Sequence, residues 1–308
     1  MKRKILHLFE FVVLVLLIGS CNNSTEPEKE KNEIPELVLI NENLTFTMGC
    51  LDLPGWYYTN LTEKPTFKAT LSPYYIGKYE VRNDEYEYFV NELGYSDSTL
   101  WSDSGWAYIN AEKRDRPVNW MKGEKPWSNC ELSNTIDRPI SNICWYEAEA
   151  YCNWLSRKTS ESFSLPTEAQ WERAARGPDP GRIFTWGNVH DKSKYNHIMA
   201  SSKLFPVGTY QEDKSYEGCF DMAGNLTEYC SDWFELYIYT KYKENEPVYN
   251  PSGPIESNTN GQKSWRGTFT GFHHDREIEY QITTFRRMGW MLKNHSRMLG
   301  FRVVKNIK

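Results

Sequence analysis

The chain has 308 residues, of which 39% are hydrophobic and 15% aromatic, and its formal net charge is −5. This composition supports a sizeable aromatic-rich core and one large domain. The acidic balance, with no basic run interleaved with aromatic residues, excludes a nucleic-acid partner from our predictions.

The N-terminus has the pattern of a bacterial lipoprotein signal peptide. Basic residues 2–4 precede the apolar stretch 11–18, which is too short to cross a bilayer as a helix. Ile-Gly-Ser-Cys21 then resembles a lipobox. We predict a signal peptide over 1–20 and a lipid on Cys21, which would hold the protein to a membrane through buried methylenes. The alternative is an ordinary signal peptide cut near Ser20, with Cys21 as a spare thiol.

The chain after Cys21 is polar and charged, which predicts a flexible tether over 21–34 and a folded domain over 35–308. Six cysteines remain in that domain: Cys50, Cys130, Cys144, Cys152, Cys219 and Cys230. An exported domain permits disulfides. Cys144 and Cys152 flank and enter one predicted helix, so we expect that they do not pair with each other. A buried free thiol is the simpler interpretation of Cys152. No Cys/His spacing typical of zinc sites is present.

The first half of the domain predicts strands at 37–40 and 44–49, paired through a polar turn, and a further strand over 67–76. A helix capped by Asn83 follows. Its apolar face consists of Tyr86, Phe89, Val90 and Leu93, and Gly94 ends it.

Residues 95–137 are rich in Trp, Ser, Asp and Gly, and we predict a long irregular insertion there. If exposed, its tryptophans would stack on a sugar or a peptide, although local core packing is the favoured interpretation. These residues are Trp101, Trp106, Trp120 and Trp127.

Further along, residues 140–144 predict a short buried strand, followed by a helix whose apolar face holds Ala148, Tyr151, Cys152 and Leu155. Thr167 opens a third helix in a capping box with Gln170, and Gly177 ends it. Short strands are predicted at 205–208 and 301–304. The fold class is therefore α+β, with two or three helices and many loops.

Four blocks resemble the sulfatase-modifying factor family, also called formylglycine-generating enzyme-like proteins. They are residues 46–49 with 78–83, 138–155 with Leu-Pro-Thr-Glu-Ala-Gln-Trp-Glu-Arg-Ala-Ala-Arg-Gly at 165–177, 206–208 with 221–225, and 250–254 with Arg266-Gly267 and Gly-Phe-Arg at 300–302. The resemblance implies a single C-type-lectin-like domain with few helices, short strands and long irregular loops. It also implies that Glu168, Trp171, Glu172 and Arg302 form a buried structural framework and have no catalytic role.

The family's enzyme resembles a copper thiolate enzyme whose two active-site cysteines precede the final Gly-Phe-Arg. Counted back without gaps from Gly300, those positions hold Glu279 and Thr284 here, and no cysteine follows Cys230. Oxygen ligands do not suit Cu(I), so we expect no copper and no copper-dependent formylglycine formation. A related branch builds an iron site with a His-rich helical domain that this sequence lacks. Adjacent His273 and His274 point apart on a strand, and we predict no histidine metal site.

A family calcium loop matches residues 221–228. By that resemblance Asp221 and Glu228 would donate side-chain oxygens, and Gly224 and Leu226 would donate backbone carbonyls, a ligand set that suits calcium. The alternative is a turn held by Asp221 hydrogen bonds alone.

Together these features predict a membrane-anchored, non-catalytic binding or assembly module of the bacterial cell envelope, similar to gliding-motility, secretion-associated or glycan-related lipoproteins. Its partner would be an envelope protein or a glycan. Asn22 after the lipid site carries no retention signal, which favours the outer membrane. The alternatives are an enzyme that oxidises exported proteins and a structural subunit of a larger complex.

Overall fold

The computed structural model describes residues 33–50, 61–123, 125–197, 201–243, 246–257, 259, 261–267 and 280–307. Residues Asn32–Lys308 make up one compact unit. The predicted signal peptide and Cys21 lie outside the described residues. None of the helices in those described ranges has the length and apolar character that a membrane span requires.

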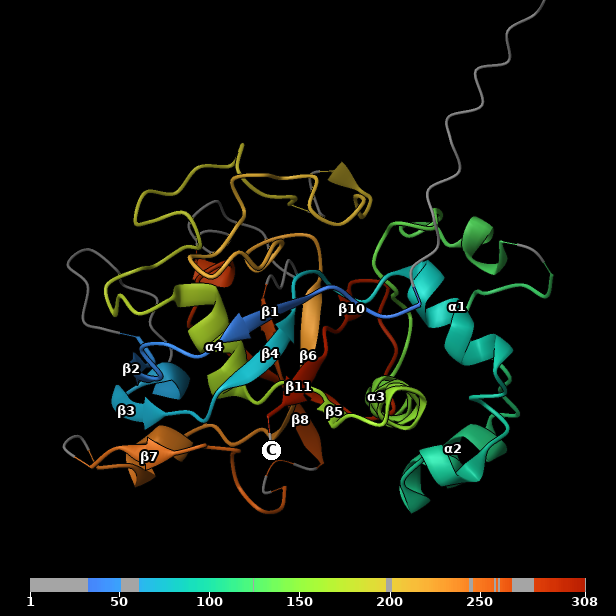
Figure 1. The fold of residues 1–308 in the computed structure, drawn as a ribbon, viewed down its shortest axis with the longest axis horizontal. Coiled ribbons are helices and arrows are strands. Elements are labelled where there is room, and N and C mark those ends of the chain that lie inside the picture. The colour runs from blue at the N-terminus through green and yellow to red at the C-terminus, as the bar shows by residue number, and fades with distance from the viewer. Residues whose placement is uncertain are drawn as a thin grey trace, which may run out of the picture. The chain divides into compact units, whose positions relative to one another are not determined.

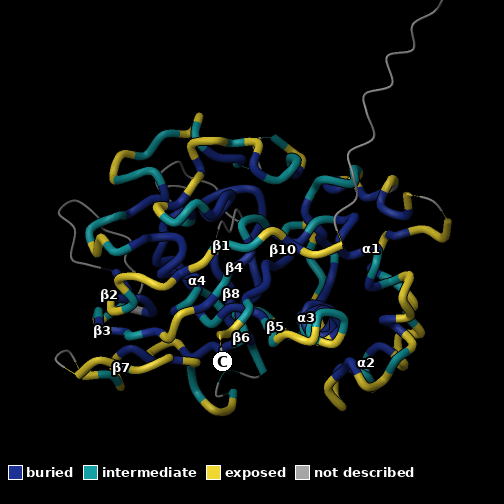
Figure 2. Tube along the Cα trace, viewed as in Figure 1, coloured by how far each residue is buried: buried dark blue, intermediate teal, exposed yellow. Residues whose placement is uncertain are grey.

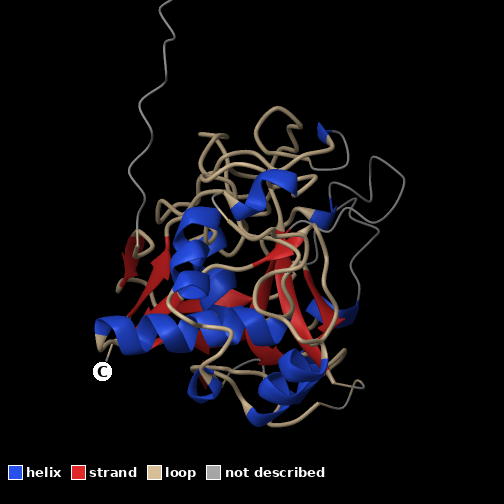
Figure 3. Cartoon of the chain, turned by 90° about the vertical axis from the view of Figure 1, so that its right-hand side faces the viewer, coloured by secondary structure: helices blue, strands red, loops and turns tan. Residues whose placement is uncertain are grey.

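Three small sheets and four α-helices make up the regular structure of the described residues (Figure 1). This confirms the prediction of an α+β fold with few helices. Much of the chain between these elements is loop, as Figure 3 shows. Buried residues concentrate around β4, β6, β8 and α4 (Figure 2).

The first sheet is antiparallel and joins distant parts of the chain in the order β1-β4-β11-β5. Its strands are β1 (Leu37–Ile40), β4 (Tyr74–Gly77), β11 (Val304–Asn306) and β5 (Phe163–Ser164). Because β11 lies between β4 and β5, residues near 304 complete a sheet that residues near 40 begin.

The second sheet has the order β10-β6-β8-β9, and the third has the order β2-β3-β7. The second contains β10 (Leu299–Gly300), β6 (Thr227–Trp233), β8 (Gln262–Gly267) and β9 (Arg287–Met291). The third contains β2 (Thr45–Met48), β3 (Phe67–Thr70) and β7 (Val248–Tyr249).

The predicted pairing of 37–40 with 44–49 is wrong, because β1 pairs with β4 and β2 pairs with β3. The predicted strand over 67–76 is two strands in two different sheets. The pattern of buried residues explains why the strand is divided. Phe67 and Ala69 are buried in the first strand, and Tyr74 and Ile76 are buried in the second. The buried phase shifts from odd to even positions across Pro73, so one continuous strand cannot bury both pairs on one face.

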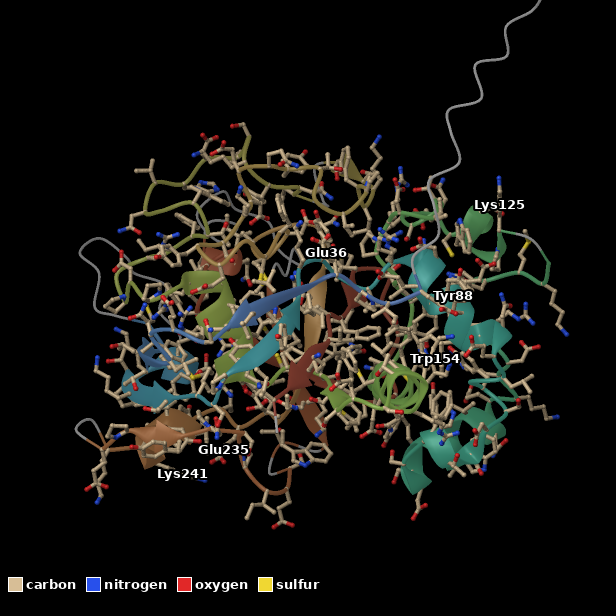
Figure 4. All side chains as sticks on the ribbon, viewed as in Figure 1. Glu36, Tyr88, Lys125, Trp154, Glu235 and Lys241 are labelled. Atoms are coloured by element: carbon tan, nitrogen blue, oxygen red, sulfur yellow. The ribbon has the colours of Figure 1, made fainter. Side chains whose placement is uncertain are left out.

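Two long stretches predicted as helices are helical: α1 (Asn83–Asn91) and α3 (Trp145–Thr159). The two pack through aromatic rings, with Tyr86 stacked on Tyr151 at 5.3 Å between centroids. Figure 4 shows Tyr88 of α1 near Trp154 of α3, and the Lys158 ammonium lies 5.8 Å and 5.2 Å from their ring centroids.

Both predicted ends of α1 need correction. Arg82, not Asn83, is the N-cap, and its backbone N–H donates to Glu85 Oε2 at 2.8 Å. The Asn83 amide instead donates to Ser133 Oγ at 2.9 Å. Leu93 is 69% exposed because the helix ends at Asn91, which moves Leu93 off the apolar face.

The insertion over 95–137 contains a helix that we did not predict, α2 (Asp103–Ala111), with the 3₁₀ turns η2 (Ser98–Leu100) and η3 (Pro126–Asn129). Two more 3₁₀ turns follow elsewhere, η1 (Leu61–Glu63) and η4 (Ile238–Lys241). Ser104 and Gly105 are weak helix formers and hid α2 from a periodicity search. Trp101, Trp120 and Trp127 are buried in the core and Trp106 packs against it, so the core-packing interpretation is confirmed.

The predicted strands at 140–144 and 205–208 are absent, because Asn142 (φ 60°) and Gly208 (φ 71°) interrupt the extended backbone. Of the strand predicted at 301–304, only Val304 lies in a strand, since β10 ends at Gly300 and β11 begins at Val304. In contrast, both ends of α4 (Glu168–Arg176) are confirmed. Thr167 Oγ1 accepts the Gln170 N–H at 3.1 Å, and Gln170 Oε1 accepts the Thr167 N–H at 2.9 Å.

Replacing Trp101 tests whether the insertion is part of the core. Trp101 is 7% exposed and donates its indole N–H to Gly94 O at 2.8 Å. Trp101→Ala is expected to lower the free energy of unfolding by about 3–5 kcal/mol, because it leaves a large cavity. Partly buried Trp106→Ala is the control and should cost clearly less. Chemical denaturation followed by fluorescence measures both, and equal stability of all three proteins would contradict this assignment.

Candidate functional site

A buried ionic framework fastens α4 to the second sheet. Arg287 on β9 donates to both oxygens of Glu168, from Nε at 2.6 Å and from Nη2 at 2.8 Å. Arg266 on β8 donates to Glu168 at 2.9 Å and to Glu172 at 2.8 Å. All four side chains are buried. This arrangement agrees with the structural role that the family resemblance gave to Glu168 and Glu172.

The spacing of α4 places its charges on one helix face. Glu168, Glu172 and Arg176 follow one another at four-residue intervals, and Arg176 pairs with Glu172 at 3.2 Å. Burial alone would raise the pKa of the Glu168 carboxyl, but the Arg287 and Arg266 guanidiniums lower it to about 2. Burial, together with the neighbouring Glu168 charge, raises the pKa of Asp232 to about 7.

A second buried pair links β6 to the segment before β11. Arg302 donates to Glu228 from Nη2 at 2.6 Å and from Nε at 2.7 Å, and the Trp171 indole donates to the same carboxylate at 2.9 Å. Arg302 also donates to the Gly77 carbonyl at 3.0 Å and to the Phe220 carbonyl at 2.9 Å. The sequence assigned Glu228 to calcium and Arg302 to the framework, whereas the structure joins the two residues directly.

The other residues of the predicted calcium loop lie beside this pair. Asp221 Oδ2 accepts the Gly208 N–H at 2.6 Å. Gly224 is required by close packing, since a Cβ there would lie 2.8 Å from the Asn196 nitrogen. Leu226 is buried, and its N–H donates to Glu80 Oε1 at 3.2 Å.

Sequence reasoning missed two buried acids of this region, Glu80 and Asp213. Burial, with Asp221 and Glu228 nearby, raises the pKa of Glu80 well above its usual value. Burial raises the pKa of Asp213 to about 6. Burial, with Asp213 nearby, raises the pKa of Asp221 to about 8. Arg302 is the cation that acts on these three acids, and it also pairs with Glu228. One guanidinium cannot neutralise several buried carboxylates, so the cluster either binds protons or attracts a further cation. Neither acid lies in a recognisable ligand spacing, and only packing reveals them.

Thr284, the position that the resemblance equates with a copper-binding cysteine, is closed off from solvent. Thr284 is buried, donates its hydroxyl to Arg182 O at 3.1 Å, and accepts from Arg176 Nε at 3.3 Å. Glu279, His273 and His274 lie outside the described residues. The structure brings one unexpected thiol nearby: Cys50 shares a core cluster with Phe285. Burial, with Glu63 nearby, raises the pKa of Cys50 to about 12, which keeps the thiol protonated.

None of the other described cysteines of the domain takes part in a disulfide. Five of them are buried free thiols: Cys130, Cys144, Cys152, Cys219 and Cys230. The buried-thiol interpretation of Cys152 is thus confirmed, and Cys144 and Cys152 do not pair.

Buried arginine–carboxylate pairs hold the small sheets of this chain together, and comparison with known proteins assigns this fold to a family. A family model for the sulfatase-modifying factor enzyme 1-like domain matches residues 23–307, and the chain belongs to this family. Among solved structures, PvdO from Pseudomonas aeruginosa superposes with a TM-score of 0.63 at 19% identity, covering 89% of this chain and 95% of PvdO.

Curated relatives include both enzymes and an inactive protein. A Mus musculus formylglycine-generating enzyme is 28% identical over 222 residues, covering 62% of this chain and 56% of that protein. A hercynine oxygenase from Mycolicibacterium thermoresistibile is 28% identical over 263 residues, covering 80% and 56%. The Mus musculus inactive C-alpha-formylglycine-generating enzyme 2 is 26% identical over 268 residues, covering 78% and 77%. The chain thus spans little more than half the length of the two enzymes.

Glu168→Gln tests the buried framework. Removing this carboxylate leaves Arg287 buried without its counter-ion, and we expect the free energy of unfolding at pH 7 to fall by about 3–5 kcal/mol. Glu131→Gln is the control, since it breaks an exposed pair with Arg297, 2.7 Å long, and should cost under about 1 kcal/mol. Urea denaturation measures both variants.

The same residue predicts a pH dependence. The folded-state pKa of Glu168 lies near 2, below its ordinary value of 4.5. Its contribution to stability is therefore complete above pH 4.5 and is lost as the pH falls toward 2. Glu168→Gln should flatten this part of the stability profile, and a profile identical in slope to the wild type would contradict the assignment.

Proposed function

We propose that the chain is a lipid-anchored, non-catalytic binding or assembly module of the bacterial cell envelope. The observation that carries this proposal is Thr284, whose hydroxyl is committed to Arg182 and Arg176 in a position that an active relative would give to a thiolate. An oxygen donor held between a carbonyl and a guanidinium offers no soft ligand to Cu(I). The sequence also contains no cysteine after Cys230.

The anchor supports the cellular setting of this proposal. The lipobox-like Ile-Gly-Ser-Cys21 and the polar residues after it fit a domain held at a membrane surface by a lipid and a tether. Asn22 favours the outer membrane. In the same family, the mouse protein named inactive aligns with this chain over most of both lengths.

A cavity of about 320 Å³ supports a neutral glycan as the ligand. It replaces the tryptophans of the insertion as the candidate glycan site, because those side chains pack in the core. It lies between the N-terminus of α4, the stretch before β4 and the segment after β11, and none of the described residues that line it has an ionisable side chain. Its polar lining consists of hydroxyls and amides: Ser72, Ser164, Thr167, Gln170, Ser231, Asn250 and Asn306. Uncharged donors and acceptors in a concave site suit a polyhydroxylated, uncharged ligand.

Glycan screening of the mature chain in detergent tests this function. We expect enrichment of neutral glycans, with affinity reduced about 10-fold or more by Asn306→Ala, which removes an amide from the cavity wall. Exposed Asn110→Ala on α2 is the matched control and should bind as the wild type does. Enrichment of an envelope protein alone, insensitive to Asn306→Ala, would assign the module to assembly. No enrichment of any partner would contradict the proposal.

The alternative function is oxidative protein modification, which some relatives' names indicate. A Cu(I) titration with a competing chelator separates the two functions. We expect no tight Cu(I) binding and no oxygen consumption with a cysteine-containing peptide. Tight binding that disappears in Cys50→Ser would favour the enzyme, because Cys50 shares a core cluster with Phe285, the residue that follows Thr284.

We also propose that calcium binds Asp221, Glu228 and the carbonyls of Gly224 and Leu226. The buried excess of carboxylates around Arg302 supports a hard dication there, although Glu228 already pairs with Arg302. The folded-state pKa of Asp221 lies near 8, above its ordinary 3.8. Without calcium, stability should therefore fall as the pH rises from about 4 to 8.

Thermal unfolding with calcium and with a chelator measures this effect. Calcium should raise the melting temperature more at pH 8 than at pH 6, because it replaces protons that leave at higher pH. Asp221→Asn should abolish the difference, whereas exposed Glu212→Gln should preserve it. Identical melting curves with and without calcium at both pH values would contradict the site.

A further inference from the structure

Three side chains to which the family resemblance assigns no role converge at the start of α3. One ligand atom from each of Cys144, Glu147 and His295 lies within 4.8 Å of the other two. Cys144 and Glu147 are completely buried, and His295 is half-buried. Within the described part of the chain, this is the one group of three histidine, cysteine or carboxylate residues close enough to share a metal ion.

The local fold brings these residues together. Cys144 is the N-cap of α3 and Glu147 is its third residue, so both side chains turn back toward the helix start. Glu147 Oε2 accepts the Cys144 N–H at 2.7 Å. His295 follows β9 and stacks on Tyr108 of α2 at 6.2 Å, and the Tyr108 hydroxyl donates to Lys293 O at 3.0 Å. Sequence spacing could not reveal the group, because 148 residues separate His295 from Glu147.

The hydrogen bonds around His295 conflict with one another. Its Nε2 lies 2.9 Å from Glu147 Oε2 and 2.8 Å from Arg114 Nη1. A protonated Nε2 donates to the carboxylate but opposes the guanidinium donor, and an unprotonated Nε2 accepts from Arg114 but opposes the carboxylate. No tautomer satisfies both contacts. A cation bound to the Nε2 lone pair satisfies the imidazole and the carboxylate together.

We propose that Cys144, Glu147 and His295 form a binding site for a zinc-like divalent transition metal, with Arg114 occupying the place of the ion when it is absent. Thiolate, imidazole and carboxylate are the zinc ligands of proteins. Three protein ligands leave the fourth tetrahedral position to water. The Tyr95 hydroxyl, 2.5 Å from Glu147 Oε1, orients the carboxylate from behind.

The charges balance in both states. Without metal, burial raises the pKa of the Cys144 thiol well above its usual value and Glu147 adds to this effect, so the sulfur is protonated, while the Arg114 guanidinium lies against His295. On binding, the thiol S–H bond breaks, its proton passes to water, and a sulfur–metal bond forms. Arg114 then turns toward solvent, and the two charges of the ion replace the proton and the guanidinium. Affinity therefore rises with pH, with one proton released per ion.

Cobalt titration of the mature chain tests the site, because a thiolate-to-cobalt charge-transfer band reports sulfur ligation directly. We expect such a band, displaced by zinc. Cys144→Ser should abolish it, and His295→Gln should weaken metal binding by more than about 10-fold. Arg114→Ala should bind more tightly than the wild type, because the competing guanidinium is gone. Cys152→Ser, a buried cysteine on the same helix outside the group, is the control and should leave the band unchanged.

His295→Gln keeps the test decisive if Cys144→Ser does not fold, since His295 is only half-buried. Circular dichroism establishes that this variant is folded before titration. The proposal is wrong if the wild type shows no sulfur–cobalt band, or if folded His295→Gln retains the band with unchanged affinity. It is also wrong if Arg114→Ala binds no more tightly than the wild type.

Discussion

The structure depends on burying acidic side chains of α4 against arginines from a sheet. Arg266 pairs with both Glu168 and Glu172, and Arg287 pairs with Glu168. All four side chains are buried. A buried guanidinium is stable only when its donors are satisfied, so each pair fixes the distance between α4, β8 and β9. Strands of two to seven residues supply few ladder hydrogen bonds, and this framework supplies the positional order that longer strands would otherwise give.

Buried carboxylates also occur in two other regions of the described structure, with different partners. Around Arg302, several carboxylates face one guanidinium, which leaves negative charge in excess and suits a hard cation. At Glu147, one carboxylate lies close to an imidazole and a thiol, which are softer ligands, and a guanidinium contacts the imidazole. The choice of partner for a buried carboxylate therefore separates a purely structural region from two regions that suit ions of different chemistry.

Local signals in the sequence predicted local structure well. Thr167, Gln170 and Gly177 defined α4 to the residue, since caps act within one helical turn. The pairing of 37–40 with 44–49 failed because strand partners depend on tertiary packing, which a run of alternating residues does not encode. The family resemblance led to residues 221–228 as a predicted calcium loop, but it did not reveal the bond between Glu228 and Arg302. The group at Cys144 stayed hidden because His295 approaches it only through the fold.

The position of β11 has a consequence for biogenesis. Residues 304–306 insert between β4 and β5, so the first sheet stays open while the ribosome has yet to deliver them. A nascent chain that lacks this strand cannot close its own core, and contacts this distant in sequence form slowly. One three-residue strand thus makes closure of the first sheet depend on contacts between distant parts of the chain.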